Sequence, residues 1–405
     1  MLCRKQDVLI LRERPDAAYL KRLTELGFEI PTILTPKFAD HHTPIAELVL
    51  QDDAPLGRLR TLAEESDALP VVFLPYAVTE LEETIARHCG LSLIGPPSWL
   101  VAKVNDKIFN KRIAEELGFP TCQGVECETL EESRGCFDRV KGSGNRVILK
   151  EPYAASGKGL YIIDNEQSFD ALLTGLSRVS RRRPAHPWIL EQWMEKKADI
   201  NYQIWISPDG KVDVFSIKRQ ILNGTVYTGS QMPAELEPEI IEAYRSYGEA
   251  IGRYLHGLGY SGVAGIDSII TADDVIIPLI EVNGRFTLST YVSFIQHVVG
   301  DKKICSRYYR ILTHDPVDFT ALSRSLEKEE LQYEPHTGEG ILLYTAGSLP
   351  VVSVSEEGRY MGRVFVLVIA DEWSKTDELA SRLEKALQAL STGRREQPRG
   401  HESII

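Results

Sequence analysis

The stretch Ile280-Glu281-Val282-Asn283-Gly284-Arg285 places a carboxylate, an amide and a guanidinium at alternate positions. In a β-strand, residues i, i+2 and i+4 project from the same face, so these three side chains should lie together. A second carboxylate, Asp267, ends a short run of small and apolar residues just upstream. Carboxylate and amide oxygens are ligands suited to Mg²⁺, and an arginine beside them can hold a phosphate or a developing oxyanion. The stretch therefore predicts a magnesium and phosphoryl site, although alone it also fits charges at the end of a surface strand.

Length and composition favour a globular protein of two to three domains. The chain has 405 residues, 43% of them hydrophobic and 26% charged, and a formal net charge of −12. This acidic balance argues against nucleic acid as the main partner, because there is no basic surplus to neutralise phosphates. No run of ~18 apolar residues is present, so no membrane span is expected. The six cysteines form no C-x-x-C pair and indicate reduced thiols in the cytoplasm.

The order of expected elements predicts a mixed α/β and α+β chain. Strands and helices alternate over residues 1–104, which is typical of an open parallel sheet. Residues 105–330 should form a second domain, with antiparallel strands near 201–218 and 261–281 and a long helix over 237–258. A small module is expected over 331–391, followed by a disordered tail over 392–405 that is rich in charge, Gly and Pro.

Two tempting nucleotide motifs fail on structural context. Residues 257–262 match G-x-G-x-x-G, but a helix precedes them and a strand follows, which reverses the order that a dinucleotide site needs. Residues 156–159 resemble the end of a P-loop. However, Pro152 stands where that motif needs glycine, Gly159 stands where it needs Ser or Thr, and the segment joins two strands.

A loop of small residues between two expected strands can instead cover a triphosphate with backbone N–H groups. Lys150 ends the strand before this loop, and Lys107 opens an earlier helix for which Asp106 is the expected cap. Either ammonium could lie on the phosphates, although each lysine taken alone also fits an exposed surface charge.

Together these features resemble the ATP-grasp superfamily, and within it the carboxylate–amine or carboxylate–thiol ligases. The resemblance runs from about Gly95 to Phe294. It implies a Rossmann-like open sheet, a lid subdomain over about 122–189, a central antiparallel ATP-grasp domain and a small C-terminal module of the kind some peptide ligases carry. It implies an ATP site made by residues in the family's order: Lys107, Lys150, Ser156, Gly157, Lys158, Gly159, Glu191, Gln192, Trp193, Met194, Asp199 and Lys218.

The resemblance also implies roles in catalysis. Two Mg²⁺ ions would be held by Asp267, Glu281 and Asn283, while Lys107, Lys150 and Arg285 would stabilise the transferring charge. Arg219, Arg285, Thr290 and Tyr291 are candidates for contact with the substrate. For Lys218 and Arg219, a solvated hairpin fits equally well. This sequence departs from the family pattern at two places: Asp199 stands where the family usually has Glu, and the lid loop carries only two glycines.

The implied activity is an ADP-forming ligase. It would convert a small carboxylate, such as an amino acid, into an acyl phosphate and join it to an amine. The alternatives are the same activation with the thiol of a carrier protein as acceptor, a small-molecule kinase on this fold, or nucleotide binding without catalysis. The intact set Asp267, Glu281, Asn283 and Arg285 argues against the last of these. Family members are often homodimers, so a homodimer is compatible with the resemblance.

Overall fold

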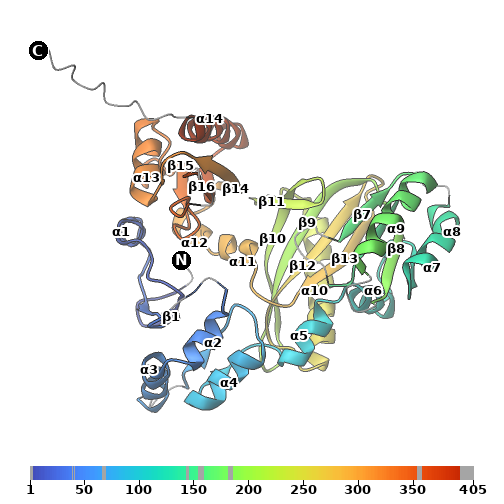
Figure 1. The fold of residues 1–405 in the computed structure, drawn as a ribbon, viewed down its shortest axis with the longest axis horizontal. Helices are drawn as coiled ribbons and strands as arrows, with labels where there is room; N and C mark the ends of the chain where they lie inside the picture. Colours follow the sequence, from blue (N-terminus) through green and yellow to red (C-terminus); the bar gives the residue numbers. More distant parts are fainter. Residues whose placement is uncertain are drawn as a thin grey trace, which may run out of the picture. The chain divides into compact units, whose positions relative to one another are not determined.

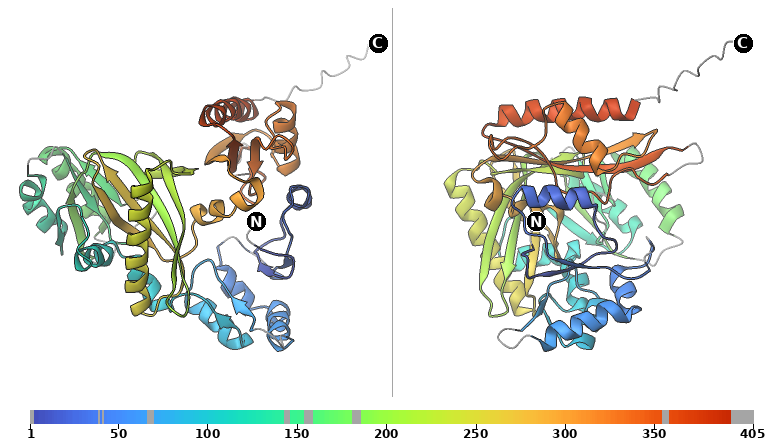
Figure 2. Two further views of the ribbon diagram at one scale, coloured as in Figure 1. Left: turned by 180° about the vertical axis from the view of Figure 1, so that it is seen from behind. Right: turned by 90° about the vertical axis from the view of Figure 1, so that its left-hand side faces the viewer.

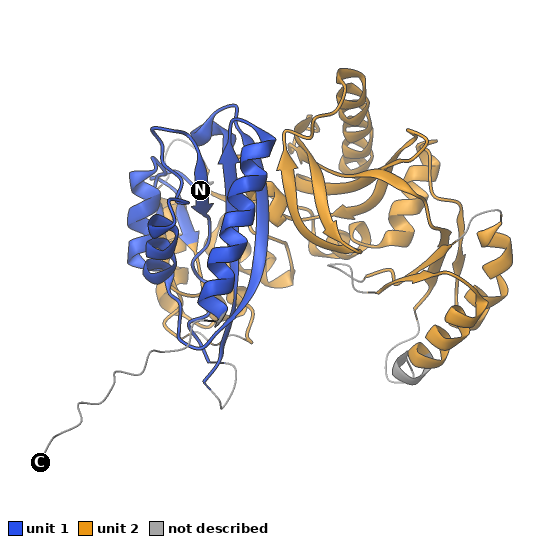
Figure 3. Ribbon diagram, turned by 90° about the horizontal axis from the view of Figure 1, so that it is seen from above, with its two compact units in different colours: residues 1–9, 14–32, 295–405 blue, residues 10–13, 33–294 orange. Residues whose placement is uncertain are grey.

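The computed structural model describes residues 3–38, 40, 42–65, 70–142, 146–153, 159–180, 186–353 and 358–392. The expected lid-loop residues Ser156, Gly157 and Lys158 and the expected disordered tail from 393 onward lie outside these ranges. The chain divides into two compact units (Figure 3): residues 1–9, 14–32 and 295–405, and residues 10–13 and 33–294. These units do not follow the boundaries expected at 104 and 330, because residues 1–9 and 14–32 group with the C-terminal part. In the described ranges, no helix has both the length and the apolar character required to cross a membrane.

The centre of the second unit is an antiparallel sheet in the order β13-β12-β9-β10-β11 (Figure 1). The strands are β9 Lys196–Ile206, β10 Val212–Asn223, β11 Val226–Met232, β12 Gly262–Thr271 and β13 Ile276–Asn283. The expected pairing of the last two is confirmed, with Asp267 opposite Glu281. Pro278 is tolerated in β13 because this strand lies at the edge of the sheet, where one row of donors is not needed for pairing.

One face of this sheet is covered by the long helix α10, Pro238–Gly257, as Figure 2 shows. Tyr202 of β9 and Tyr244 of α10 are fully buried between them, with ring centroids 5.2 Å apart. Gly248 allows the close approach, because a Cβ there would lie 2.6 Å from Val214 Cγ2. Helices α5, Ser98–Val104, and α6, Lys107–Glu116, contribute to the same apolar core. Asp106 caps α6 as expected, accepting a hydrogen bond from the Ile108 N–H at 2.8 Å.

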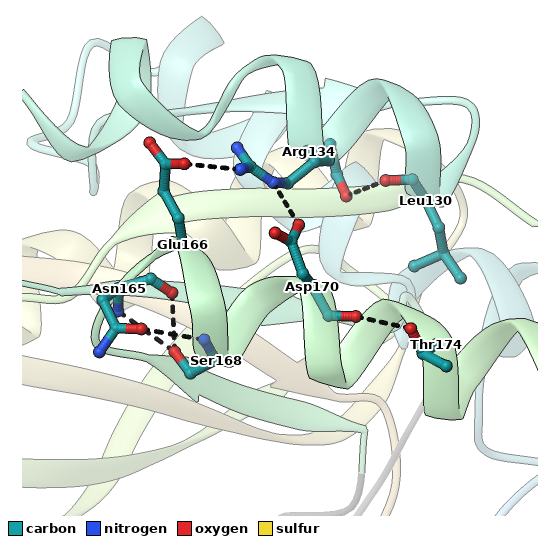
Figure 4. A network of polar contacts seen from close by, with 8 residues as sticks. Leu130, Arg134, Asn165, Glu166, Ser168, Asp170 and Thr174 are labelled. Carbon is teal, nitrogen blue, oxygen red and sulfur yellow. Dashed lines mark hydrogen bonds and ion pairs between the residues drawn. The ribbon is translucent and has the colours of Figure 1, made fainter.

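The lid is a second layered element with its own core. Its four-stranded sheet runs in the order β5-β8-β6-β7, where β5 is Gly124–Cys127, β6 Val147–Lys150, β7 Leu160–Ile163 and β8 Trp188–Gln192. Its helices are α7 Leu130–Gly135, α8 Phe137–Lys141 and α9 Glu166–Ser180. Arg134 of α7 donates to Asp170 at 2.7 Å and to Glu166 at 2.9 Å, both on α9 (Figure 4). This exposed bridge ties two helices of the lid together.

The rest of the second unit contains α2 Ile45–Leu50, α3 Asp53–Glu64, α4 Glu80–Cys89 and the parallel pair β3 Val72–Phe73 and β4 Ser92–Leu93. Helix α4 starts at a Thr79–Glu82 capping box, the arrangement that fixes such helix starts. After the sheet come α11, Leu288–Ser293, in the second unit and α12, Gln296–Val299, in the first. The strands β1 Val8–Ile10 and β2 Thr32–Leu34 pair near the N-terminus.

The first unit contains the strands β14 Lys303–Thr313, β16 Tyr360–Ala370 and β15 Gly340–Leu343, in that antiparallel order. Its other helices are α1 Ala17–Glu25, α13 Phe319–Lys328 and α14 Trp373–Thr392. Tyr19 of α1 packs edge-on against Phe319 of α13, with ring centroids 5.3 Å apart. The N-terminal helix and the C-terminal module thus share contacts that sequence spacing alone did not reveal.

Candidate active site

A cavity of about 380 Å³ lies within the second unit. Its wall is formed by the central sheet, the lid strands and the segment after β13. Most of the predicted site residues meet there: Lys107, Lys150, Gln192, Trp193, Met194, Asp199, Asp267, Glu281, Asn283 and Arg285. Their sequence positions span almost 180 residues, and the fold brings them into one space.

The carboxylate pair lies at the floor of this cavity. Asp267 and Glu281 stand opposite each other on β12 and β13, and Asn283 stands opposite Gly265. One oxygen of Asp267, Oδ1, accepts hydrogen bonds from Asn201 Nδ2 and Gln220 Nε2, each at 2.8 Å. Its other oxygen, Oδ2, accepts from Asn283 Nδ2 at 3.3 Å. Burial, followed by the charge of Glu281, raises the pKa of Asp267 to about 7, against the effect of these hydrogen bonds.

Lys107 faces this pair from the start of α6. Its side chain is 4% exposed, and its Nζ lies 3.2 Å from Glu281 Oε2. Its backbone N–H donates to the carbonyl of Pro152, at the start of the lid loop, at 3.2 Å. The lysine is therefore anchored between the carboxylates and the segment that leads into the loop.

Lys150 belongs to a buried cluster of three charges in which Glu191 lies between two lysines. The Nζ of Lys150 lies 2.5 Å from Glu191 Oε2, and the Nζ of Lys111 lies 2.9 Å from Oε1. Burial would lower the pKa of Lys150, but Glu191 outweighs it and raises that pKa. Burial would likewise raise the pKa of Glu191, but the two lysines outweigh it and lower that pKa. These pKa shifts favour the charged forms of Lys150 and Glu191, so two buried ammonium groups face one buried carboxylate beside the cavity; Lys111 also lies 3.8 Å from the exposed Glu115.

Trp193, Met194 and Asp199 also line the cavity, and they follow the end of β8 in the chain. Arg146 and Lys196 lie over the Trp193 ring, at 5.4 and 5.6 Å from its centroid. Lys196 also pairs with Asp199 at 2.6 Å, so this acid is already held by a neighbouring lysine. The combination of an indole face and a polar rim suits the stacking of a flat ring.

Backbone contacts on both sides fix the segment that carries Arg285. The Gly284 N–H donates to Asn105 Oδ1 at 3.2 Å, and the Phe286 N–H donates to the carbonyl of Tyr76 at 3.0 Å. A Cβ on Gly284 would lie 3.2 Å from Val104 Cγ1, which favours glycine there. Arg285 is thereby held at the cavity wall next to Asn283.

Other predicted residues lie away from this wall. The Lys218 side chain is fully buried and donates to the Ser289 carbonyl at 2.8 Å and to Ser293 Oγ at 2.5 Å. Thr290 is also fully buried, and Tyr291 stacks on Phe286. Neither these three residues nor Arg219 or Gly159 lines the cavity, and Glu191 borders a smaller adjoining space instead.

Sequence reasoning missed several residues that the fold places at the site. Tyr76, Lys196, Asn201 and Gln220 line the cavity, and Lys111 completes the buried charge cluster. The polar residues at 201 and 203 alternate with apolar ones in a strand, and this was the available signal. Tyr76 carried no such signal, because it follows a short strand far from the other site residues.

The donor set at the floor fits Mg²⁺. Two carboxylates and an amide are the hard ligands this ion prefers, and a cation bound there would offset the burial and the Glu281 charge that raise the pKa of Asp267. Within the described ranges, no three or more His, Cys, Asp or Glu side chains gather as a metal-binding group. Magnesium commonly binds through one or two carboxylates together with substrate phosphates, and this set is of that kind.

Three domain families match the chain: the pre-ATP-grasp domain at residues 1–91, the ATP-grasp domain at 112–289 and the PGM1 C-terminal domain at 321–383. Residues 112–289 therefore carry an ATP-grasp domain, which confirms the expected fold class. The matched ATP-grasp region contains almost every cavity residue described above.

A curated relative is the butirosin acyl-carrier protein–L-glutamate ligase of Niallia circulans, 28% identical over 295 residues. The match covers 72% of this chain and 64% of that protein, so it spans less than two thirds of the relative.

Among solved structures, the dimeric biotin carboxylase domain of the Hydrogenobacter thermophilus 2-oxoglutarate carboxylase, in complex with MgADP, ADP and bicarbonate, has a TM-score of 0.59. It is 18% identical, and the match covers 94% of this chain and 84% of that one. The N5-carboxyaminoimidazole ribonucleotide synthetase of Thermus thermophilus has a TM-score of 0.55. It is 17% identical, with coverages of 94% and 97%. These two likenesses bear on the fold.

Proposed function

We propose that this protein is an ADP-forming ligase that converts a small carboxylate into an acyl phosphate and transfers the acyl group to an acceptor. The observation that carries the proposal is the single cavity in which Lys107, Lys150, Asp267, Glu281 and Arg285 meet. A site with lysines on one side and paired acids on the other suits MgATP. The arginine beyond the acids suits an anionic substrate.

The residues would divide the work by charge. A carboxylate attacks a phosphate poorly because the two anions repel each other, so positive charge must surround both. Lys107 and Lys150 would hold the phosphates, and Lys111 would share the negative charge of Glu191, so that this acid offsets less of the Lys150 charge. Arg285 would orient the carboxylate and stabilise the oxyanion that forms when the acceptor attacks. Trp193 and Met194 would hold the adenine, and Asp199 the ribose.

Asp267, Glu281 and Asn283 would hold magnesium, as two ions in the family's arrangement. Magnesium bound there would neutralise charge on the phosphates and hold the reacting oxygens in line. Asn283 would have to turn its amide oxygen toward the ion, since its Nδ2 now faces Asp267. Gln220 and Asn201 bind Asp267 Oδ1, which leaves Oδ2 as the oxygen facing Asn283.

Two kinds of acceptor are alternatives for the second step. An amine would give an amide, the first of the two expected outcomes. The relative from Niallia circulans, whose name describes ligation of L-glutamate to an acyl-carrier protein, supports the alternative in which the acceptor belongs to a carrier protein. All six cysteines are free thiols, consistent with the proposed cytoplasmic location.

The test is ADP release from MgATP with a panel of amino acids, each assayed with an amine panel and with a carrier protein that bears its thiol arm. Mass spectrometry of the products then separates the two acceptors. A new amide on the small molecule supports the amine, and an added acyl mass on the carrier supports the second acceptor. ADP release that no carboxylate stimulates would argue against ligation altogether. A homodimer stays a prediction for sedimentation measurements.

A further inference from the structure

Within the second unit, a chain of buried side-chain hydrogen bonds connects Asp267 on β12 to Thr290 in α11. Asn201 donates to Asp267 at 2.8 Å, and Gln203 Nε2 donates to Asn201 Oδ1 at 2.6 Å. Thr290 Oγ1 then donates to Gln203 Oε1 at 2.7 Å. Asn201 is 2% exposed, while Gln203 and Thr290 are fully buried. Buried amides are retained where each partner is satisfied, since an unmade bond there is costly.

The far end of this chain is the start of α11. Thr287 and Thr290 form a capping box, in which the Thr287 N–H donates to Thr290 Oγ1 at 2.9 Å and the Thr290 N–H donates to Thr287 Oγ1 at 3.3 Å. Gln203 Nε2 also lies 3.4 Å from Thr287 Oγ1. The amide of Gln203 therefore contacts both residues that fix where this helix begins.

The two ends of this hydrogen-bond chain lie on either side of the segment that carries Arg285. Asn283, at one end of this segment, donates to Asp267, and Thr287, at the other end, is held by Gln203. The strand opposite makes room for this amide, because a Cβ on Gly265 would lie 2.7 Å from Gln203 Nε2. Gln203 does not line the cavity.

We infer that Gln203 is a positioning residue, which fixes Asp267 and the Arg285 segment relative to each other through Asn201 and Thr290. This inference rests on the proposed function, because it assigns Asp267 to magnesium and Arg285 to the substrate carboxylate. The amide sets the geometry in which the metal acid and the arginine face one reacting carboxylate, without touching substrate itself.

Thr290 offers a matched pair of variants. Thr290→Val keeps the volume of the side chain and removes its hydroxyl, whereas Thr290→Ser keeps the hydroxyl and removes a methyl group. Two quantities would be measured: the magnesium dependence of ADP binding by calorimetry, and the KM for the carboxylate in ADP release. Thr313→Val is the control, because it removes a buried threonine hydroxyl, one that bonds the Asp315 carbonyl, in the first unit.

Thr290→Val should weaken the magnesium effect on ADP binding and raise the carboxylate KM by about 10- to 100-fold, the loss typical for groups behind a metal ligand. Thr290→Ser and Thr313→Val should stay near the wild type in both measurements. Gln203→Met should change the magnesium effect and the carboxylate KM as much as Thr290→Val does. The double variant should lose no more than Gln203→Met alone, because each substitution breaks the same chain of hydrogen bonds.

Equal losses in Thr290→Ser and Thr290→Val would overturn the inference, since volume rather than the hydroxyl would then matter. Additive losses in the double variant would also overturn it. Calorimetry separates this failure from failure of the proposed function. If the wild type releases no ADP with any carboxylate, a magnesium effect that is lost in Thr290→Val and Gln203→Met but kept in Thr290→Ser and Thr313→Val still supports the positioning role.

Discussion

Lys150 and Glu191 form a buried ion pair in which Nζ lies 2.5 Å from Oε2. In such a pair the negative charge of Glu191 would offset the positive charge of Lys150, and the lysine would then attract phosphate weakly. The second lysine, Lys111, changes this balance by pairing with the other oxygen of Glu191. Two ammonium groups then share one buried carboxylate, while the exposed Glu115, 3.8 Å from Lys111, offsets little of this charge because water screens it.

Lys111→Met should therefore weaken ATP binding by about tenfold, equal to ~1.4 kcal/mol, although Lys111 itself does not line the main cavity. Calorimetric titration with ATP measures this. Arg112→Met is the matched control, because Arg112 is the next residue on the same helix and its pair with Glu126 is exposed, with 58% of the arginine side chain accessible. Such pairs contribute only ~0–1 kcal/mol to stability. Equal losses in both variants would contradict the charge argument.

Lys218 gives a prediction about pH. Burial lowers its pKa from 10.5 to about 7. Between these values the unfolded chain binds more protons than the folded one, so the Lys218 contribution makes stability rise with pH over that window. Below pH ~7 both states are protonated and the destabilisation is constant.

Lys218→Met should remove this pH dependence. Between pH ~7.5 and ~9.5 the free energy of unfolding of the wild type should rise, relative to that of the variant, by on the order of 2 kcal/mol, at 1.36 kcal/mol per pH unit. Urea unfolding at the two pH values tests the difference. The comparison across pH cancels the constant cost of the lost bonds to Ser289 and Ser293. Parallel curves would show that Lys218 keeps an ordinary pKa.

Gly265 and Gly257 should respond in opposite directions to alanine. A Cβ at Gly265 would lie 2.7 Å from Gln203 Nε2, so Gly265→Ala should cost ~1–3 kcal/mol through overpacking. Gly257 ends α10 and a Cβ there meets nothing within 4 Å, so Gly257→Ala should be neutral or stabilise by up to ~1 kcal/mol. Thermal unfolding of the two variants measures this, and a stable Gly265→Ala would mean that Gln203 can move aside.

The sequence was most informative where local periodicity determines geometry. Alternation in the strand predicted that Glu281 and Asn283 share a face, and the observed register with Asp267 and Gly265 agrees. A cap and a helix pattern likewise located Lys107 at the start of α6. These features depend on neighbours in the chain.

Features that depend on distant contacts were not predicted. Lys218 was a candidate for the ATP site, with a solvated hairpin as the equal alternative, but its ammonium is directed to Ser289 and Ser293, more than seventy residues later, because helix α11 packs there. Glu191 was expected in the ATP site, and nothing local indicated that Lys111 would meet its side chain. The grouping of the N-terminal helix with the C-terminal module has the same origin, since pairs such as Tyr19 and Phe319 lie three hundred residues apart.

The central claim is that this cavity makes an acyl phosphate, and trapping with hydroxylamine tests it most directly. With MgATP and the correct carboxylate, ADP and the corresponding hydroxamate should form together. Glu281→Gln should lower both by at least ~100-fold, as expected when charge stabilisation at the phosphates is lost. The exposed Glu239→Gln on α10 should change neither. Carboxylate-dependent ADP release without hydroxamate, or hydroxamate formation undiminished in Glu281→Gln, would contradict the account.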